Sequence, residues 1–284
     1  MEAAIVETLV YGILAPAVIA GVLLLVAWRP WQEEAPEGFW GGGFGFAAGY
    51  LAAHFGLNGT PDTMPYLVGG LAVVAGVEAF AASKRWLVWL VRVMVVPVAT
   101  YLVAAFMFSA DHWAGVEAVA WLAGFTVSAV AAIATLDTYA REHPGATVPI
   151  SLLLLGTGAA LVLALSGTAR VGELLGGVTA MFGAAMVLSW WDGRLSLARG
   201  GVTVGVLLIA SLVIFGYVGL FEPYQSVAGR SSLVLVVTPH LLWIDRLGVL
   251  GELEGSKGTA LRAVLVGVGA AASVLLAWIG AGGA

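Results

Sequence analysis

The amino-acid sequence predicts an all-α polytopic integral membrane protein, a bundle of about ten transmembrane helices in one domain over residues 1–284. Three observations predict it. Hydrophobic residues make up 61% of the chain and charged residues 10%, whereas soluble domains carry about a quarter charged residues. The mean hydropathy is +0.99. Long apolar runs alternate with short polar loops, of which the longest covers residues 245–257.

The apolar runs are long enough to cross the hydrocarbon core, which takes about 20 residues of helix. Turn and breaker sequences such as NGTPDTMP and REHPGA separate them. The first run lacks a basic flank and is too long for a cleaved signal, so we expect a retained helix. The segments expected to be helical are 4–28, 39–57, 66–83, 86–110, 114–136, 148–166, 171–191, 201–220, 231–245 and 260–279.

Lysine and arginine are concentrated in alternate loops. Counted with their helix flanks, the loops after odd-numbered segments hold ten of these residues, and the other loops hold two, Arg170 and Arg230. Basic residues are retained on the cytoplasmic side of membrane proteins. The sequence therefore predicts a plasma (inner) membrane protein with an external N-terminus and C-terminus and cytoplasmic odd-numbered loops. The ten residues are Arg29, Lys84, Arg85, Arg92, Arg141, Arg194, Arg199, Arg246, Lys257 and Arg262.

Ten segments are compatible with a weak inverted repeat of five plus five helices. Two glycine-containing stretches match at one fixed offset. Glycine is common in this chain, with 39 residues, so chance matches are frequent. The repeat is therefore a hypothesis for the helix arrangement to test. The aligned residues are Gly42, Gly43, Gly49, Asn58 and Gly59 with Gly176, Gly177, Gly183, Asp192 and Gly193.

The run FWGGGFGFAAGY in segment 39–57 has two interpretations. A dinucleotide-binding fingerprint needs Gly-x-Gly-x-x-Gly after a strand, but here the last glycine comes one residue too late and the run is an apolar helix. Small residues at every fourth position instead form a helix face that a neighbouring backbone can approach closely. The two expected packing faces are Gly41, Gly45, Gly49 and Ala53, and Gly172, Gly176, Ala180 and Ala184.

Glu78 and Arg92 are ionisable residues expected within the membrane, where a charge costs about 2.5–3.5 kcal/mol on insertion scales. The short SKRW turn makes their segments antiparallel neighbours, so the two side chains lie at similar depth. We therefore expect a Glu78–Arg92 pair. It is either a static structural pair or a functional one, in which a coupling-ion or substrate carboxylate is released when the pair opens.

Pro239 and His240, in LVVTPHLLWID, are expected to interrupt segment 231–245. Proline cannot donate a backbone hydrogen bond, so a carbonyl about one turn earlier, near Leu235, is left for another partner. Histidine titrates near neutral pH and can relay a proton. The alternative is a proline kink beside a hydrogen-bonded histidine.

No metal, cofactor or catalytic site is expected. His54, Asp111, His112 and Glu117 fall near one membrane surface, but their spacing matches no zinc signature. The absence of cysteine excludes thiolate nucleophiles and iron–sulfur ligation. With a net charge of −5, the chain has no basic surface for nucleic acid.

Three functions fit these features. The first is a secondary carrier of a small apolar or weakly polar molecule, since there are few buried charges and no nucleotide motif. The second is a non-catalytic membrane scaffold or subunit that binds partner transmembrane helices or a second copy of itself. The third is an intramembrane enzyme acting on lipid, although no acid–base cluster is visible. All three contact membrane lipid. A carrier predicts kinked helices around a polar mid-membrane cavity, and a scaffold predicts a dry core with an exposed small-residue groove.

Overall fold

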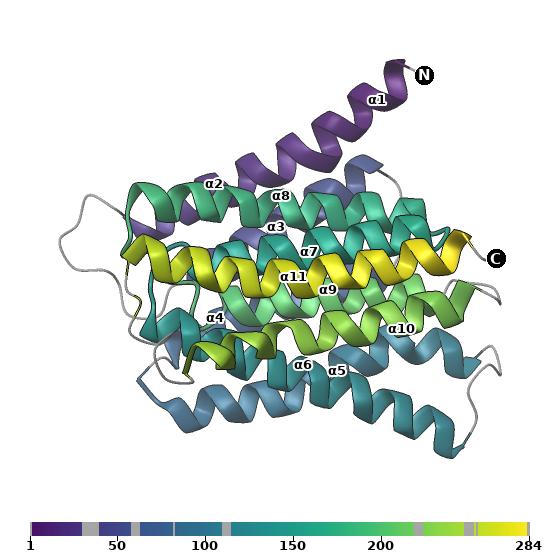
Figure 1. The fold of residues 1–284 in the computed structure, drawn as a ribbon. Coiled ribbons are helices and arrows are strands. Elements are labelled where there is room, and N and C mark those ends of the chain that lie inside the picture. Colours follow the sequence, from purple (N-terminus) through teal and green to yellow (C-terminus); the bar gives the residue numbers. More distant parts are fainter. Residues whose placement is uncertain are drawn as a thin grey trace.

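The computed structural model describes residues 2–29, 40–57, 63–81, 83–109, 115–218, 224–246, 253 and 255–282, and within these residues it contains helices and no strand. The helices form one bundle with their axes roughly side by side (Figure 1). In chain order they are α1 (Glu2–Leu9), the π-helical turn η1 (Val10–Leu14), α2 (Ala15–Trp28), α3 (Trp40–Leu57), α4 (Thr63–Phe80), α5 (Arg85–Ser109), α6 (Val116–Glu142), α7 (Thr147–Leu165), α8 (Ala169–Trp191), α9 (Gly201–Val218), α10 (Tyr224–Val237), the 3₁₀ helix η2 (Thr238–Arg246) and α11 (Gly255–Gly282).

Each segment expected from hydropathy coincides with helical structure. The first consists of α1, η1 and α2, and the ninth of α10 and η2. The largest differences are at two ends, because α6 continues to Glu142 and α10 begins at Tyr224. Expected helix ends and motif residues that lie outside the described residues are Phe39, Asn58, Gly59, Ala110, Asp111, His112, Ala114 and Leu220.

Six of the described helices are long and apolar enough to cross a membrane, which indicates an integral membrane protein. Length and hydropathy therefore support six crossings among the described residues and do not confirm the expected count of about ten. Three further apolar helices are shorter: Leu67–Phe80, Gly201–Gly216 and Ser231–Asp245. The six long stretches are Val6–Trp28, Arg85–Ala105, Val119–Glu142, Thr147–Leu165, Ala169–Trp191 and Gly255–Ala281.

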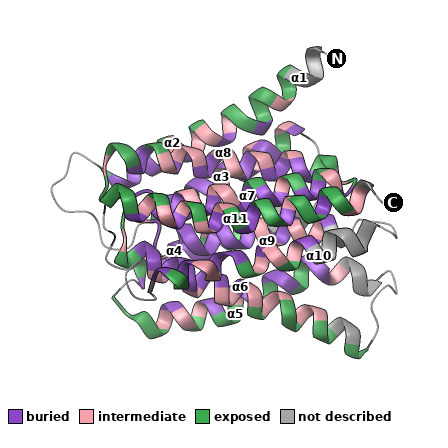
Figure 2. Ribbon diagram, in the orientation of Figure 1, coloured by how far each residue is buried: buried purple, intermediate pink, exposed green. Residues whose placement is uncertain are grey.

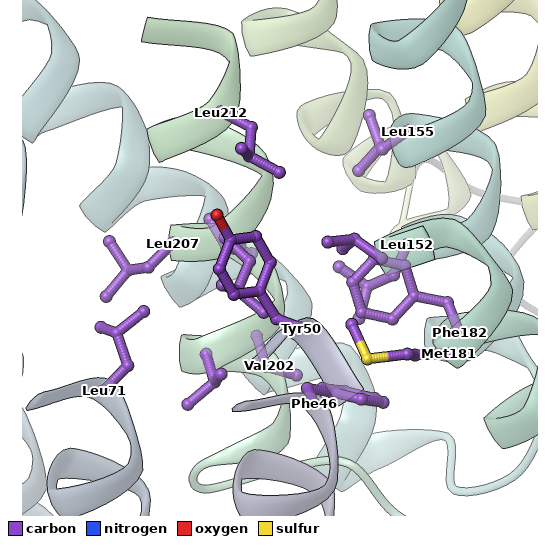
Figure 3. Packing of buried hydrophobic residues seen from close by; sticks show 14 of the residues in the cluster. Phe46, Tyr50, Leu71, Leu152, Leu155, Met181, Phe182, Val202, Leu207 and Leu212 are labelled. Atoms are coloured by element: carbon purple, nitrogen blue, oxygen red, sulfur yellow. The ribbon is translucent and has the colours of Figure 1, made fainter. Parts of the chain in front are cut away.

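The helix α9 lies at the centre of the core, and the helices around it bury most of its described residues (Figure 2). Phe46 of α3 packs edge to face on Phe182 of α8, with ring centroids 4.9 Å apart. Figure 3 shows these rings beside Tyr50 and between side chains of α4, α7 and α9. Lipid tails are as apolar as leucine, so this close packing, rather than escape from water, holds membrane helices together.

The small-residue face of α3 lies against α2. The backbone oxygen of Ala20 is 3.1 Å from the position that a Cβ on Gly45 would take, and that of Pro16 is 2.9 Å from the same position on Gly49. Ala53, one turn further on, is fully buried. A larger side chain would overlap the α2 backbone, so this face is occupied within the chain.

The row Gly172, Gly176, Ala180 and Ala184 on α8 does not contact one neighbouring helix along its length. Gly172 lies against α7, where the oxygen of Ala160 is 3.0 Å from its Cβ position, but nothing lies within 4 Å of that position on Gly176. Ala180 and Ala184 are only partly buried. The row contacts α7 at Gly172 and α2 at Ala184, because α8 has neighbours on several sides.

The close approach of α8 to the first helix is made by Gly177, the residue after Gly176. The oxygen of Gly12 lies 3.0 Å from its Cβ position. Pro16, four residues after Gly12, has no N–H to donate to that oxygen, and the chain forms the π-helical turn η1 there. The backbone of α8 therefore packs directly on the interruption of the first helix, beyond which α1 leans away from the bundle (Figure 1).

The inverted repeat stays a hypothesis. Aligned glycines make different contacts: the Cβ position on Gly42 is 3.1 Å from Cα of Gly201, whereas its counterpart Gly176 has no close neighbour. The Cβ position on Gly43 is 3.2 Å from the oxygen of Gly200, whereas that on its counterpart Gly177 is 3.0 Å from the oxygen of Gly12 in η1. The matched glycines are therefore not in equivalent environments.

Candidate functional site

Arg92 lies at the centre of a buried polar network. The tight turn between α4 and α5 places it beside Glu78, as its Nε donates to Glu78 Oε1 at 2.9 Å and its Nη2 donates to Oε2 at 2.8 Å. The side chains of Arg92 and Glu78 are 1% and 0% exposed. Bidentate pairing of this kind gives the strongest hydrogen bonds between side chains.

Two further residues complete the network, and sequence reasoning missed both. Asp137 of α6 accepts a hydrogen bond from Arg92 Nη2 at 3.0 Å, and the backbone N–H of Arg199 donates to the same oxygen at 2.9 Å. The hydroxyl of Thr203 on α9 lies 2.9 Å and 3.0 Å from the two carboxylate oxygens of Glu78. We call Glu78, Arg92, Asp137 and Thr203 the Arg92 cluster.

The sequence-based prediction does not include Asp137, because the expected helix ends at Leu136 and α6 continues to Glu142. The signal for a longer helix was the spacing of Asp137 and Arg141, which is four residues and places the pair on one helix face. Arg141 Nε lies 3.3 Å from Asp137 Oδ2. No local pattern marks Thr203, since threonine is common in apolar helices and its partner is 125 residues away.

The Arg92 cluster connects α4, α5, α6 and α9 at one point. Its two carboxylates and one guanidinium leave one excess negative charge, which Arg141, 29% exposed, balances from the edge. The guanidinium lies 5.2 Å from the ring centroid of Trp89, and its Nη1 has no hydrogen-bond partner among the described residues. Buried charges need nearly complete partners, so moving any one of these helices would expose an unpaired charge.

A second buried ion pair joins η2 to α11. Arg262 Nε donates to Asp245 Oδ2 at 2.6 Å, and both side chains are under 5% exposed. Arg92 and Arg262 belong to the basic residues of the loops and their helix flanks, but both lie inside the bundle in ion pairs. Arg262 also lines an open hollow of about 910 Å³ at the ends of α6, α8 and α11.

The interruption near Pro239 is visible as a change of helix type. The α-helix α10 ends at Val237, and 3₁₀ helix η2 begins at Thr238, whose hydroxyl donates to the oxygen of Val234 at 2.7 Å. His240 Nδ1 lies 3.0 Å from the hydroxyl oxygen of Thr135 on α6. The structure therefore places His240 against α6 and not with the Glu78–Arg92 pair.

Two neighbouring cavities lie beside this interruption, each of about 100 Å³. The first is bounded by α6, α7, α9 and α10 and includes Pro239 and Leu235. The second lies between α6, α9 and α10 and includes Trp121. Both are lined by apolar residues apart from Ser128 and Ser232, and neither reaches Glu78, Arg92 or His240. These two cavities are therefore not the polar mid-membrane cavity that a carrier predicts.

The residues considered as metal ligands do not form a site. Among the described residues, no three His, Asp or Glu side chains lie close enough together to hold a metal ion. His54 is buried on α3, where its ring stacks on that of Tyr50 with centroids 6.1 Å apart. Asp111 and His112 lie outside the described residues, and the side chain of Glu117 is not described.

No protein-family model and no curated protein matches this chain. What the arrangement offers is an apolar binding space beside a helix interruption, together with a charged network that connects four helices at another place.

Proposed function

We propose that the protein is a secondary carrier that crosses the membrane ten times and moves a small apolar or weakly polar molecule. The observation that carries the proposal is the pair of cavities beside the α10–η2 interruption. Their lining is apolar and not the polar lining expected of a carrier, so the proposal is limited to substrates with few polar groups. Carriers bind their substrates where transmembrane helices are discontinuous, because such helices can bend and expose a site to either side.

The lining restricts the substrate. Phe125, Ala132, Ile209 and Leu235 are representative of the first cavity, which holds no ionisable side chain. A charged substrate would lose its hydration there without an opposite charge, at a cost of several kcal/mol. An apolar cavity of about 150 Å³ binds a benzene-sized molecule, which sets the scale for the substrate.

The ionic contacts divide the bundle into a fixed part and a part that can move. The Arg92 cluster connects α4, α5, α6 and α9, and the Asp245–Arg262 pair connects η2 to α11. The segment Tyr224–Val237 lies outside both ionic contacts and ends at the interruption. Bending of α10 at the interruption would open the cavities while both ionic contacts stay closed.

The proposed topology has both termini outside the plasma membrane. The start of α1 and the end of α11 lie at the same end of the bundle (Figure 1), which an even number of crossings requires. The basic residues in the odd-numbered loops support a cytoplasmic position for the opposite end.

The experiment compares the wild type with Ala132→Phe, which fills the first cavity. Purified protein is screened by thermal unfolding against a panel of neutral and charged small molecules, and compounds that stabilise the wild type are tested for flux in proteoliposomes. We expect neutral compounds to stabilise and to be transported by the wild type alone. Equal stabilisation and flux in Ala132→Phe, or stabilisation by charged compounds only, would contradict the proposal.

A scaffold is the second candidate, favoured by a groove on the outer surface. The groove has a volume of about 570 Å³ and runs between α7 and α11, over Gly158, Gly267, Ala270 and Ala271. Small residues of this kind let a partner helix approach. Ala271→Trp would dissociate an oligomer that forms through this groove, as measured by light scattering in detergent, and would leave a monomeric carrier unchanged.

A further inference from the structure

We propose that the cavities beside α10 bind a neutral alcohol or phenol whose hydroxyl group hydrogen-bonds to Ser232. The inference rests on the proposed function, since it assigns a ligand class to the same site. Three observations support it: an unpartnered hydroxyl in the wall, a second hydroxyl with complementary capacity, and the size and neutrality of the space.

Ser232 carries the argument. Its Oγ is buried and has no hydrogen-bond partner among the described residues, and it lies in the wall of both cavities. A buried hydroxyl without a partner costs about 1–3 kcal/mol. Of the four buried side-chain atoms without a partner among the described residues, Ser232 Oγ belongs to a residue that lines these cavities, so its hydroxyl is available to a molecule that binds there.

Ser128 has the complementary hydrogen-bonding capacity. Its hydroxyl already donates to the backbone oxygen of Gly124 at 2.6 Å, so only its lone pairs are available to a ligand. Ser232 can donate its hydroxyl hydrogen. A ligand hydroxyl both accepts and donates, and therefore suits both serines, whereas a ketone or an ether could only accept.

The two cavities are adjacent, since Phe125, Ser128, Val213, Ser232 and Val236 line both of them. Each cavity has a volume of about 100 Å³, which is on the scale of the apolar cavity of about 150 Å³ that binds benzene. Trp121 and Phe125 form a stacked pair with centroids 5.6 Å apart, and both border the second cavity. Aromatic walls favour a flat or cyclic ligand body.

The lining excludes the charged relatives of such a ligand. It contains no Lys, Arg, His, Asp or Glu. A carboxylate or an ammonium group would therefore be desolvated without compensation. The ligand class is neutral, with one hydroxyl group on an apolar body of about the size of methylphenol.

The test compares two probes of nearly the same shape, 4-methylphenol and toluene. Binding to purified full-length protein in detergent is measured by calorimetry. The blank for partition into the micelle is Ser232→Phe, which places a large side chain at a residue that lines both cavities. We expect the wild type to bind 4-methylphenol about tenfold more tightly than toluene, because one hydrogen bond to a buried hydroxyl contributes about that factor.

Ser232→Ala should abolish this preference while toluene binding is retained. Ser128→Ala should reduce the preference in part. Ser256→Ala, an exposed serine on α11, is the matched control and should behave like the wild type. Equal binding of the two probes to the wild type, or an unchanged preference in Ser232→Ala, would overturn the inference and leave the carrier proposal standing.

Two other outcomes separate the proposals. If neither probe binds the wild type more tightly than Ser232→Phe, the cavities are not a binding site, and the ligand class and the proposed substrate site both fail. If 4-methylphenol binds with the expected preference but is not transported in proteoliposomes, the ligand class is supported and only the carrier activity is wrong.

Discussion

Arg92 holds Glu78 through two nearly parallel hydrogen bonds, Nε to Oε1 at 2.9 Å and Nη2 to Oε2 at 2.8 Å, and the same Nη2 also reaches Asp137 at 3.0 Å. One guanidinium therefore serves two carboxylates from different helices. The asymmetry predicts that the three charged residues are not equally important for stability.

Arg92→Met should be the most destabilising change in the cluster. It leaves two buried carboxylates without their cation, and breaking a buried pair costs about 3–5 kcal/mol. Glu78→Gln should cost less, since Arg92 keeps Asp137. Thermal unfolding in detergent measures both. Arg170→Gln on the exposed Arg170–Glu173 pair is the control and should have almost no effect. Equal melting temperatures for Arg92→Met and the wild type would contradict the prediction.

Exchanging the charges, Glu78→Arg with Arg92→Glu, should not rescue the single variants. If the cluster were a simple pair, the exchange would restore it. Here it would bring the new carboxylate within reach of Asp137, and like charges at this distance repel. We expect the double exchange to unfold at or below the temperature of Arg92→Met. Recovery to the wild-type temperature would show that Asp137 does not belong to the network.

Adjacent glycines on α8 should respond in opposite directions to the same methyl group. Gly177→Ala places a Cβ 3.0 Å from the oxygen of Gly12 and 3.2 Å from Cβ of Ala53, and overpacking of this kind costs about 1–3 kcal/mol. Gly176→Ala meets nothing within 4 Å and should stabilise the helix by about 0.5–1 kcal/mol. Unfolding temperatures measured side by side decide this, and a loss of stability in both variants would mean that α8 is rotated differently.

We propose in addition that a proton on His240 controls transport from outside the cavities, so His240→Ala should abolish the pH dependence of transport without unfolding the protein. Thr135, the contact of His240, keeps its hydrogen bond from Trp243 Nε1 at 3.1 Å, so the local structure survives. Flux in proteoliposomes is measured over about pH 5.5 to 8, the range in which histidine changes charge. His143→Ala, in the α6–α7 loop, is the control. A pH profile like that of the wild type would remove His240 from the mechanism, and Pro239→Ala would then test the helix interruption alone.

A reporter that fluoresces only in the cytoplasm should be dark when fused to the C-terminus. A fusion truncated after Arg194, in the loop between α8 and α9, should be bright. The reason is the concentration of basic residues in the odd-numbered loops. A bright C-terminal fusion would invert the topology or change the number of crossings.

Local signals in the sequence were sufficient for the positions of the helices and for one contact. The Glu78–Arg92 pair was predictable because the SKRW turn makes α4 and α5 neighbours, so the depth of each residue follows from its distance from the turn. Asp137 required a helix longer than hydropathy indicated. Thr203, which is 125 residues from Glu78, was not predictable, since nothing near it in the chain marks it as a partner.

The sequence by itself determined which segments are helical. A helix satisfies its backbone hydrogen bonds within one segment, and the apolar length that it needs is a run of consecutive residues. Only the tertiary structure decided which face of each helix meets which neighbour. A soluble helix reveals its inner face by amphipathicity, but these helices are apolar on all sides, so their sequences carry no comparable signal. For this reason the sequence did not show that Gly177, and not Gly176, contacts the first helix. Nor did any local motif show that Ser232 lines a cavity.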